Sequence, residues 1–367
     1  SEISLVKGEM MNLDYYYSKN CSEELFKKLY QGYEKAMMDK GLLDFDDMLV
    51  LCYELFTQRK DILAAWQNKY RYILIDEFQG KGVNISLPSL RIDAFSLDVM
   101  SKVQDIKKSS LTFAPEAGTQ RMRDVINKGL TEEIILKGAA EAFHGGWNRV
   151  KLYFMLGLPT ETREDMEGIA LLSEKVAELY YDEIPKEQRN GKVQVVASSS
   201  FFVPKPFTPF QWAQMCTKEE FLERAYIVKD KFKEMLNRKS LKYNYHEADL
   251  TVLEGVLARG DRRVAAVVEE VYKNGAMFDS WGEYFNNDTW MQAFETCGVD
   301  IDFYTTRERS LDEVFPWDFI DAGVTKDFLK REWANAQAET VTPNCRMRCS
   351  GCGVRKYGGG VCFEERA

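Results

Sequence analysis

The sequence predicts an α/β protein: a partial parallel (β/α) barrel with a helical C-terminal region, preceded by a mainly helical N-terminal fragment. Three observations lead to this prediction. Strand-like and helix-like segments alternate from residue 82 to about residue 215. Helical periodicity dominates the region after the alternation, whereas the start of the chain combines helices with one strand. We therefore divide the chain into four parts, residues 1–80, 81–215, 216–340 and the cysteine-rich 341–367.

Composition narrows the class of protein. The 367 residues are 45% hydrophobic and 29% charged, as in a folded globular protein of two or three domains. Lys and Arg number 49 against 58 Asp and Glu, and the net charge of -9 argues against a nucleic-acid partner. We find no apolar run of about 18 residues and no signal peptide, so we expect no membrane partner and a cytoplasmic location.

Two helices are expected near the start of the chain, followed by a short third one that carries Ile62, Leu63 and Trp66. Ser22 is a candidate N-cap for the first helix, and Gly41 ends it. The apolar residues of this helix are Leu25, Phe26, Leu29, Tyr30 and Tyr33. The second helix covers about residues 45–56, and its predicted inward-facing residues are Leu49, Cys52, Tyr53 and Phe56.

A short apolar strand at residues 72–75 ends on Asp76 and Glu77. Such an acidic pair can hold the magnesium ion of a nucleotide and orient a water, although an acidic turn is the simpler alternative. Together with residues 43–49, this segment resembles superfamily-1 DNA helicases of the Rep/UvrD type over about residues 10–79. The resemblance identifies the acidic pair as the Walker B motif. No G-x-x-x-x-G-K-[ST] phosphate loop occurs in these residues, so we expect no ATP hydrolysis.

Repeated β-α units follow. Strands are predicted at residues 83–87, 111–114, 149–156 and 192–203. Helices are predicted at about residues 95–107, at 119–143 with a break near Gly129 and a cap at Thr131, and at 163–181. Parallel strands place their carboxyl ends at one edge, where reactive groups usually gather. The loops at those ends are rich in glycine and proline, and they cover residues 88–91, 115–119, 157–162 and 204–209.

Three of these segments carry a second resemblance. Residues 111–128, 150–162 and 202–212 resemble the later barrel strands of radical S-adenosylmethionine enzymes, and within them the cobalamin-binding-domain type. This resemblance extends over about residues 83–367. It implies an enzyme that uses a [4Fe-4S] cluster and S-adenosylmethionine to generate a 5′-deoxyadenosyl radical. In the family the C-x3-C-x2-C cluster motif follows the first barrel strand, before the region that matches here, and the helicase-like segment occupies that place, so we expect a truncated barrel. Cys345, Cys349 and Cys352 have the same spacing, but they follow the barrel and we assign them to a separate site.

The resemblance also assigns cofactor contacts. Glu116, Gly118 and Thr119 would contact the ribose or the methionine end of S-adenosylmethionine, and Gly157 with Pro159 would pack near its adenine. Ser89 and Arg91, at a neighbouring strand end, are further candidates. The alternative for Glu116 is a carboxylate that faces the dipole of the following helix.

Four cysteines crowd the tail of the chain, and their spacing suits a bound metal. They are Cys345, Cys349, Cys352 and Cys362. Four thiolates hold either zinc or an iron–sulfur cluster, and the alternative is a tail with free thiols. Elsewhere, Arg259, Arg262 and Arg263 could pair with a phosphate, although a salt-bridged helix start is the commoner arrangement.

The leading hypothesis is therefore a truncated radical S-adenosylmethionine protein. The alternatives are a fragment of an ATP-dependent DNA helicase and a non-catalytic metal-binding protein. The substrate is not apparent from the sequence.

Overall fold

The computed structural model describes residues 2–8, 11, 13, 16–18, 20–59, 61–62, 111–345 and 347–357. The chain divides into two compact units, residues 1–77 and 78–367, which we treat separately. Several predicted features lie outside the described residues. These are the strands at 72–75 and 83–87, the helix at 95–107, and the side chains of Asp76, Glu77, Ser89, Arg91 and Cys362.

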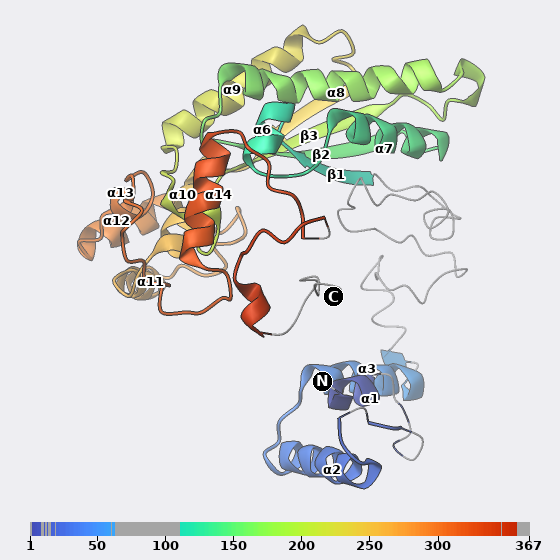
Figure 1. The fold of residues 1–367 in the computed structure, drawn as a ribbon, viewed down its shortest axis with the longest axis vertical. Helices are drawn as coiled ribbons and strands as arrows, with labels where there is room; N and C mark the ends of the chain where they lie inside the picture. The colour runs from blue at the N-terminus through green and yellow to red at the C-terminus, as the bar shows by residue number, and fades with distance from the viewer. Residues whose placement is uncertain are drawn as a thin grey trace. The chain divides into compact units, whose positions relative to one another are not determined.

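The described part of the first unit is helical, as predicted (Figure 1). It contains α1 (Glu2–Gly8), α2 (Glu23–Asp39) and α3 (Phe45–Gln58). Ser22 occupies the N-cap position of α2, although its side chain makes no capping bond. Asp44 caps α3 reciprocally, because its side chain accepts from the backbone N of Asp47 at 2.7 Å and its backbone N donates to Asp47 at 3.0 Å.

A buried lysine joins the helices of this unit. The Nζ atom of Lys7 lies 2.7 Å from Glu34, 3.0 Å from Asp44 and 2.6 Å from Asp47. Burial opposes the charge of Lys7, but the bonds to Asp47, Glu34 and Asp44 outweigh burial and raise the pKa of Lys7. The hydroxyl of Tyr33 donates to Asp44, and this bond, ahead of the contact with Lys7, lowers the pKa of Asp44 to about 2. The cluster fastens α1 against α3.

The predicted apolar faces of α2 and α3 are confirmed in part, since Tyr30, Tyr33 and Phe56 are half-buried. Phe26 is buried, but Leu25 and Leu29 are exposed, and so are Cys52 and Tyr53. The described part of this unit has three helices, too few to cover every apolar side chain of α2 and α3.

A parallel sheet forms the centre of the second unit. Its strands are β1 (Leu111–Glu116), β2 (Arg149–Leu156), β3 (Gln194–Phe201) and β4 (Leu241–Tyr245), in that spatial order. All three pairings are parallel, and the first three strands confirm the prediction. β4 was not expected, because the sequence indicated helices there. The predicted partial barrel is corrected, since the sheet is open and the described strands form no barrel.

Helices cover one face of this sheet (Figure 1). They are α7 (Glu132–His144), α8 (Arg163–Glu183) and α9 (Lys218–Glu234), while the short α6 (Gln120–Val125) follows β1. Alternate residues of each strand face this layer; in β2 they are Val150, Leu152, Phe154 and Leu156. Thr131 caps α7 by accepting from the backbone N of Ile134, which confirms the predicted break.

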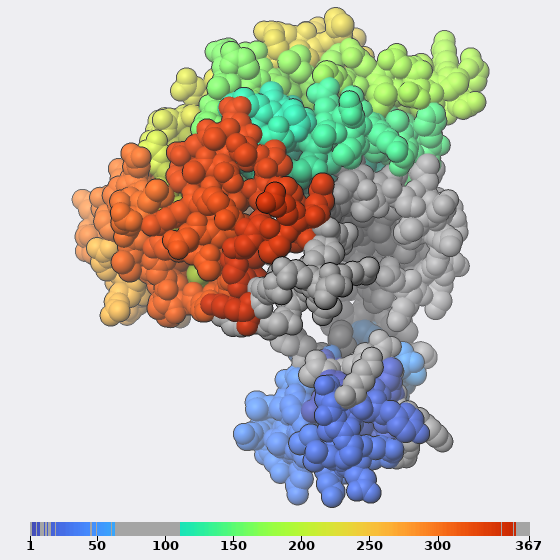
Figure 2. Space-filling model, in the orientation of Figure 1, coloured from blue at the N-terminus to red at the C-terminus, as the bar shows by residue number. Residues whose placement is uncertain are grey.

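The remaining described helices pack around two further clusters of buried apolar residues. They are α10 (Ala248–Arg259), α11 (Val264–Lys273), α12 (Asn287–Thr296), α13 (Ile301–Tyr304) and α14 (Lys326–Gln337). Short 3-10 turns occur at Lys186–Gln188, Pro209–Trp212 and Val354–Tyr357. In Figure 2 the segments after α10, coloured orange to red, form one continuous surface.

Candidate functional site at the carboxyl edge of the sheet

The candidate site lies where the loops leave the carboxyl ends of β1 and β2. Glu116, the last residue of β1, pairs with Phe154 of β2. Its backbone is left-handed, with φ of +67°, an uncommon conformation for a residue other than glycine. The Glu116 carboxylate is partly exposed and lies 3.0 Å from the Nζ atom of Lys128. Whether Glu116 contacts S-adenosylmethionine stays a prediction.

The residues after Glu116 hold the loop in place. A Cβ atom at Gly118 would lie 2.2 Å from the backbone N of Ile169 and 2.4 Å from the carbonyl carbon of Gly168. Gly118 is therefore needed so that this loop can touch α8. The Thr119 hydroxyl accepts from the backbone N of Met122, which caps α6, and donates to Asp165.

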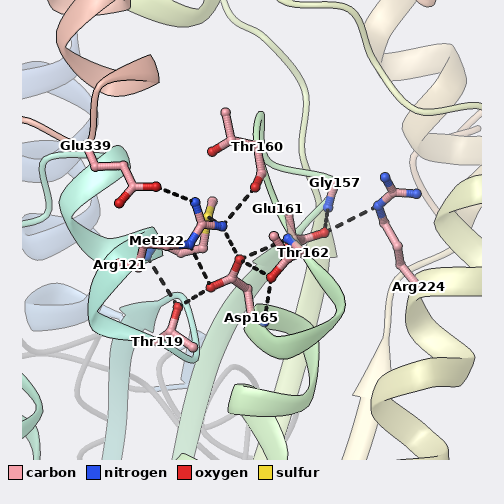
Figure 3. A network of polar contacts seen from close by, with 10 residues as sticks. All are labelled: Thr119, Arg121, Met122, Gly157, Thr160, Glu161, Thr162, Asp165, Arg224 and Glu339. Carbon is pink, nitrogen blue, oxygen red and sulfur yellow. Dashed lines mark hydrogen bonds and ion pairs between the residues drawn. The ribbon is translucent and has the colours of Figure 1, made fainter.

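Asp165 is the centre of a polar network that joins the two loops (Figure 3). Its side chain is 4% exposed. Besides Thr119, it accepts from the backbone N and the hydroxyl of Thr162, each at 2.9 Å. Arg121 donates to both carboxylate oxygens of Asp165. Burial alone would raise the pKa of Asp165, but the bonds from Arg121 and Thr119 outweigh it and lower that pKa.

Arg121 extends the network to the C-terminal helices. Its Nη2 atom donates to the carbonyl of Thr160 at 2.8 Å, and its Nη1 atom donates to Glu339 at 2.8 Å (Figure 3). Thr160 and Glu339 both have left-handed backbones, with φ of +65° and +56°. The guanidinium of Arg121 therefore fixes three chain segments that are distant in sequence.

A second arginine of this region is wholly buried. Arg123 is 0% exposed, and its guanidinium donates to the carbonyls of Leu130 at 3.0 Å and Ala117 at 2.9 Å. It also donates to Gly118 at 3.4 Å and to the side chain of Gln120 at 3.2 Å. Burial lowers the pKa of Arg123. These acceptors replace the water that the guanidinium loses.

Glu161 supports the loop after β2. Its side chain is 3% exposed, accepts from the backbone N of Gly157 at 2.8 Å, and lies 3.3 Å from the Nε atom of Arg224 (Figure 3). Burial raises the pKa of Glu161 to about 7, against the opposing effects of Gly157 and Arg224. Glu161 therefore changes its charge near neutral pH.

Gly157 has a steric role in this loop. Its φ is +83°, and a Cβ atom there would lie 2.7 Å from the ring of Phe221 and 3.1 Å from the sulfur of Cys216. Pro159 is half-buried. The Cβ positions of Gly118 and Gly157 and the hydroxyl of Thr119 are thus engaged within the protein, and whether these three residues contact a cofactor stays a prediction. Of the predicted polar contacts, Glu116 keeps a partly exposed carboxylate.

The sequence reasoning brought the right loops together but missed the residues that connect them. Glu116, Gly118, Thr119, Gly157 and Pro159 do lie along one edge of the sheet. The connecting residues that were missed are Arg121, Glu161, Asp165 and Arg224. One signal was present for Asp165, because Thr162 followed three residues later by an acid is a capping pattern.

The tail cysteines do not form a metal site among the described residues. No group of three or more His, Cys, Asp or Glu side chains there could hold a metal ion, which corrects the expectation of an assembled site. Cys345 and Cys349 are exposed and Cys352 is half-buried. The fourth predicted ligand, Cys362, lies outside the described residues. Cys349 borders a pocket of about 240 Å³ that also includes Arg331, Glu332, Asn335 and Arg348.

Comparison with known proteins finds a family match in the N-terminal segment. Residues 3–81 match the UvrD/REP helicase N-terminal domain. The protein YjcD of Bacillus subtilis, named for an ATP-dependent DNA helicase, is 47% identical over 57 residues, or 16% of this chain and 8% of that protein. DNA helicase II of Escherichia coli is 37% identical over 60 residues, again 16% of this chain and 8% of the helicase.

A longer match reaches the second unit. An uncharacterized protein of Methanocaldococcus jannaschii is 31% identical over 264 residues, which cover 69% of this chain and 54% of that protein. An alignment of this length necessarily includes much of the sheet unit. The chain thus spans about half of this relative and a small share of the helicases.

These findings correct the leading hypothesis. The family match is to the UvrD/REP helicase domain, and the comparisons give no support for a radical S-adenosylmethionine, iron–sulfur or cobalamin-binding protein. The helicase alternative is the better supported one. A helicase domain suggests a nucleic-acid partner, which conflicts with the expectation drawn from net charge. Among the helices that the structure describes, none has the length and apolar character needed to span a membrane.

Proposed function

We propose that this chain binds DNA through its helicase-type N-terminal segment without hydrolysing ATP. The observation that carries the proposal is the match of residues 3–81 to the UvrD/REP helicase N-terminal domain. The absence of a G-x-x-x-x-G-K-[ST] motif from the 367 residues supports the second part, because the triphosphate then lacks its backbone cradle and lysine.

The helix α2 offers the cations for such a contact. Lys28, Lys35 and Lys40 are exposed, and the first two share a face because they are two helical turns apart. The acidic side chains Glu34, Asp44 and Asp47 are turned toward Lys7 instead. Exposed Glu24 and Asp39 lie one turn before Lys28 and one turn after Lys35, so a phosphate contact on this face of α2 would depend on the individual lysines and not on an overall positive charge.

Fluorescence anisotropy with a labelled single-stranded oligonucleotide tests the proposal on the full chain. We expect salt-dependent binding that weakens about tenfold in the combined variant Lys28→Gln, Lys35→Gln and Lys40→Gln. The slope of log K against log salt should fall by about 2, since each phosphate contact contributes about 0.7 for single strands.

The matched control replaces three exposed lysines of the second unit, Lys137, Lys151 and Lys239, by Gln. This control has the same net charge as the α2 variant and should bind like the wild type. Equal weakening in both variants, or no binding by the wild type, would contradict the proposal. ATP turnover that disappears in Asp76→Ala would contradict its second part.

A second candidate function is binding of a small ligand at the carboxyl edge of the sheet. It is favoured by backbone strain, because Glu116, Thr160 and Phe207 have φ of +67°, +65° and +58° in the loops after three successive strands. S-adenosylmethionine, the cofactor predicted from the sequence, is the first ligand to test. A saturable rise in the unfolding temperature that Glu116→Gln abolishes and the exposed control Glu133→Gln retains would support this function; no rise would oppose it.

A further inference from the structure

One buried charge in the second unit has no partner. Arg259, the last residue of α10, is 0% exposed. None of its three guanidinium nitrogens has a hydrogen-bond partner in the part of the chain that the structure describes. Buried guanidinium groups in proteins are normally paired with acceptors, as Arg123 is here. Arg259 therefore needs an explanation.

Two further arginines lie near Arg259. Arg309 is 5% exposed; its Nη2 atom donates to the carbonyl of Tyr304 at 3.1 Å, while its Nε atom has no partner among the described residues. Arg307 donates to both carboxylate oxygens of Glu313, at 2.9 and 2.7 Å. Tyr304 connects Arg309 with the segment that follows Arg259, because its carbonyl accepts from Arg309 at 3.1 Å and its hydroxyl donates to Asp261 at 3.0 Å. The charges of Arg309, Arg307 and Glu313 also affect the pKa of Arg259. We call these four residues the arginine cluster.

The charges of the arginine cluster do not balance. The cluster has three guanidinium groups and one carboxylate, and that carboxylate is already engaged by Arg307. Burial, followed by repulsion from Arg309 and Arg307, lowers the pKa of Arg259 to about 9. Arg259 thus keeps its proton at neutral pH. An unpaired ion in the interior is destabilising by several kcal/mol, so a missing counterion is the simplest account of this arrangement.

We propose that the arginine cluster is a binding site for a small oxyanion, such as inorganic phosphate or the phosphate group of a larger molecule. The guanidinium groups of Arg259 and Arg309 supply unused N–H donors, and their planar arrangement matches two oxygens of an oxyanion. Arg307 and Glu313, with side chains 33% and 25% exposed, form the more accessible part of the cluster. The anion would enter beside this pair and compete with Glu313 for Arg307.

Phosphate titrations of the full chain, at constant ionic strength, test the site. In the wild type, phosphate should raise the unfolding temperature in a saturable manner, by roughly 5 °C at a hundredfold excess over Kd. Arg259→Met should abolish this shift, whereas Arg262→Met, which changes an exposed arginine three residues further on, should retain it. Without phosphate, Arg259→Met should unfold at or above the wild-type temperature, because it removes an unpaired buried charge.

Glu313→Gln gives an independent prediction of opposite sign. It removes the competing carboxylate, so phosphate should bind several-fold more tightly, as measured by equilibrium dialysis. This variant keeps the proposal falsifiable if Arg259→Met does not fold. Tighter binding of glycerol phosphate than of inorganic phosphate would identify the anion as part of a larger molecule. Equal phosphate shifts in the wild type and in Arg259→Met, or weaker binding by Glu313→Gln, would overturn the proposal.

Discussion

Two regions of the second unit bury an arginine, and they treat its charge in opposite ways. Arg123 at the carboxyl edge and Arg259 at the end of α10 are both 0% exposed. Arg123 donates to three backbone carbonyls and one side-chain oxygen. Arg259 has no acceptor among the described residues. A buried guanidinium thus has its hydrogen bonds made within the protein at Arg123, whereas at Arg259 its charge has no partner among the described residues.

The difference follows from the local chain path. The segments on both sides of α6 surround Arg123, because Ala117 and Gly118 precede this helix and Leu130 follows it, and their carbonyls accept from the guanidinium. Arg259 ends a helix, and the neighbouring polar side chains are mainly other arginines. Replacing each arginine by an apolar residue of similar size should therefore have opposite results.

The largest effect is expected at Arg123. Arg123→Met would remove the guanidinium donors from the buried carbonyls of Ala117, Gly118 and Leu130, and we expect unfolding in urea to become easier by roughly 3–5 kcal/mol. Arg259→Met in phosphate-free buffer is the matched comparison and should not destabilise the protein. Similar losses in the two variants would remove the distinction between the regions.

The next effect concerns the close contact of the β1 loop with α8. Gly118→Ala would place a Cβ atom against the backbone of Ile169 and Gly168, which cannot move without moving the helix. We expect a loss of about 3 kcal/mol in the free energy of unfolding. Gly282→Ala is the control, because a Cβ atom there meets nothing within 4 Å. If both variants unfold alike, the loop is not held by this contact.

The smallest effect is a pH dependence at Glu161. Its pKa is raised by burial from 4.5 to about 7 in the folded protein, so the folded state binds the proton more tightly than the unfolded state. The stabilisation is complete below pH 4.5 and is lost as the pH rises through 7. Relative to Glu161→Gln, the wild type should lose roughly 2–3 kcal/mol of stability between about pH 5 and 8. A constant difference between the two proteins across this range would contradict the assigned pKa.

Many elements could be predicted because their signals are local. The boundaries of β2, the start of α8 and the cap at Thr131 follow from alternation and capping within a few residues. β4 escaped prediction because its five residues alternate only partly buried side chains with exposed ones, between two helices. The exposure of Cys52 and Tyr53 in α3, which were expected to face inward, was missed for another reason, because periodicity shows an apolar stripe on a helix but not whether another element covers it.

The candidate site divides in the same way. The loops could be predicted from the glycine and proline residues that follow each strand. Because consecutive strands of β-α units are parallel, those loops were expected at one edge of the sheet. The hydrogen-bond partners of the site residues could not be predicted, because Thr119 bonds to Asp165 and Arg121 bonds to Glu339, which are far apart in the sequence. The resemblance of about residues 10–79 to helicases was also apparent from the sequence, and the family match over residues 3–81 confirmed it.

The order of residues alone thus specified where helices and strands begin, which loops share an edge, and which family the first segment resembles, since each depends on neighbours along the chain. Only the tertiary structure determined which charged side chains have hydrogen-bond partners. Nothing in the sequence distinguishes Arg123 from Arg259. They differ in the carbonyls and side chains that the folded chain brings near each guanidinium, because electrostatic pairing depends on distance in space.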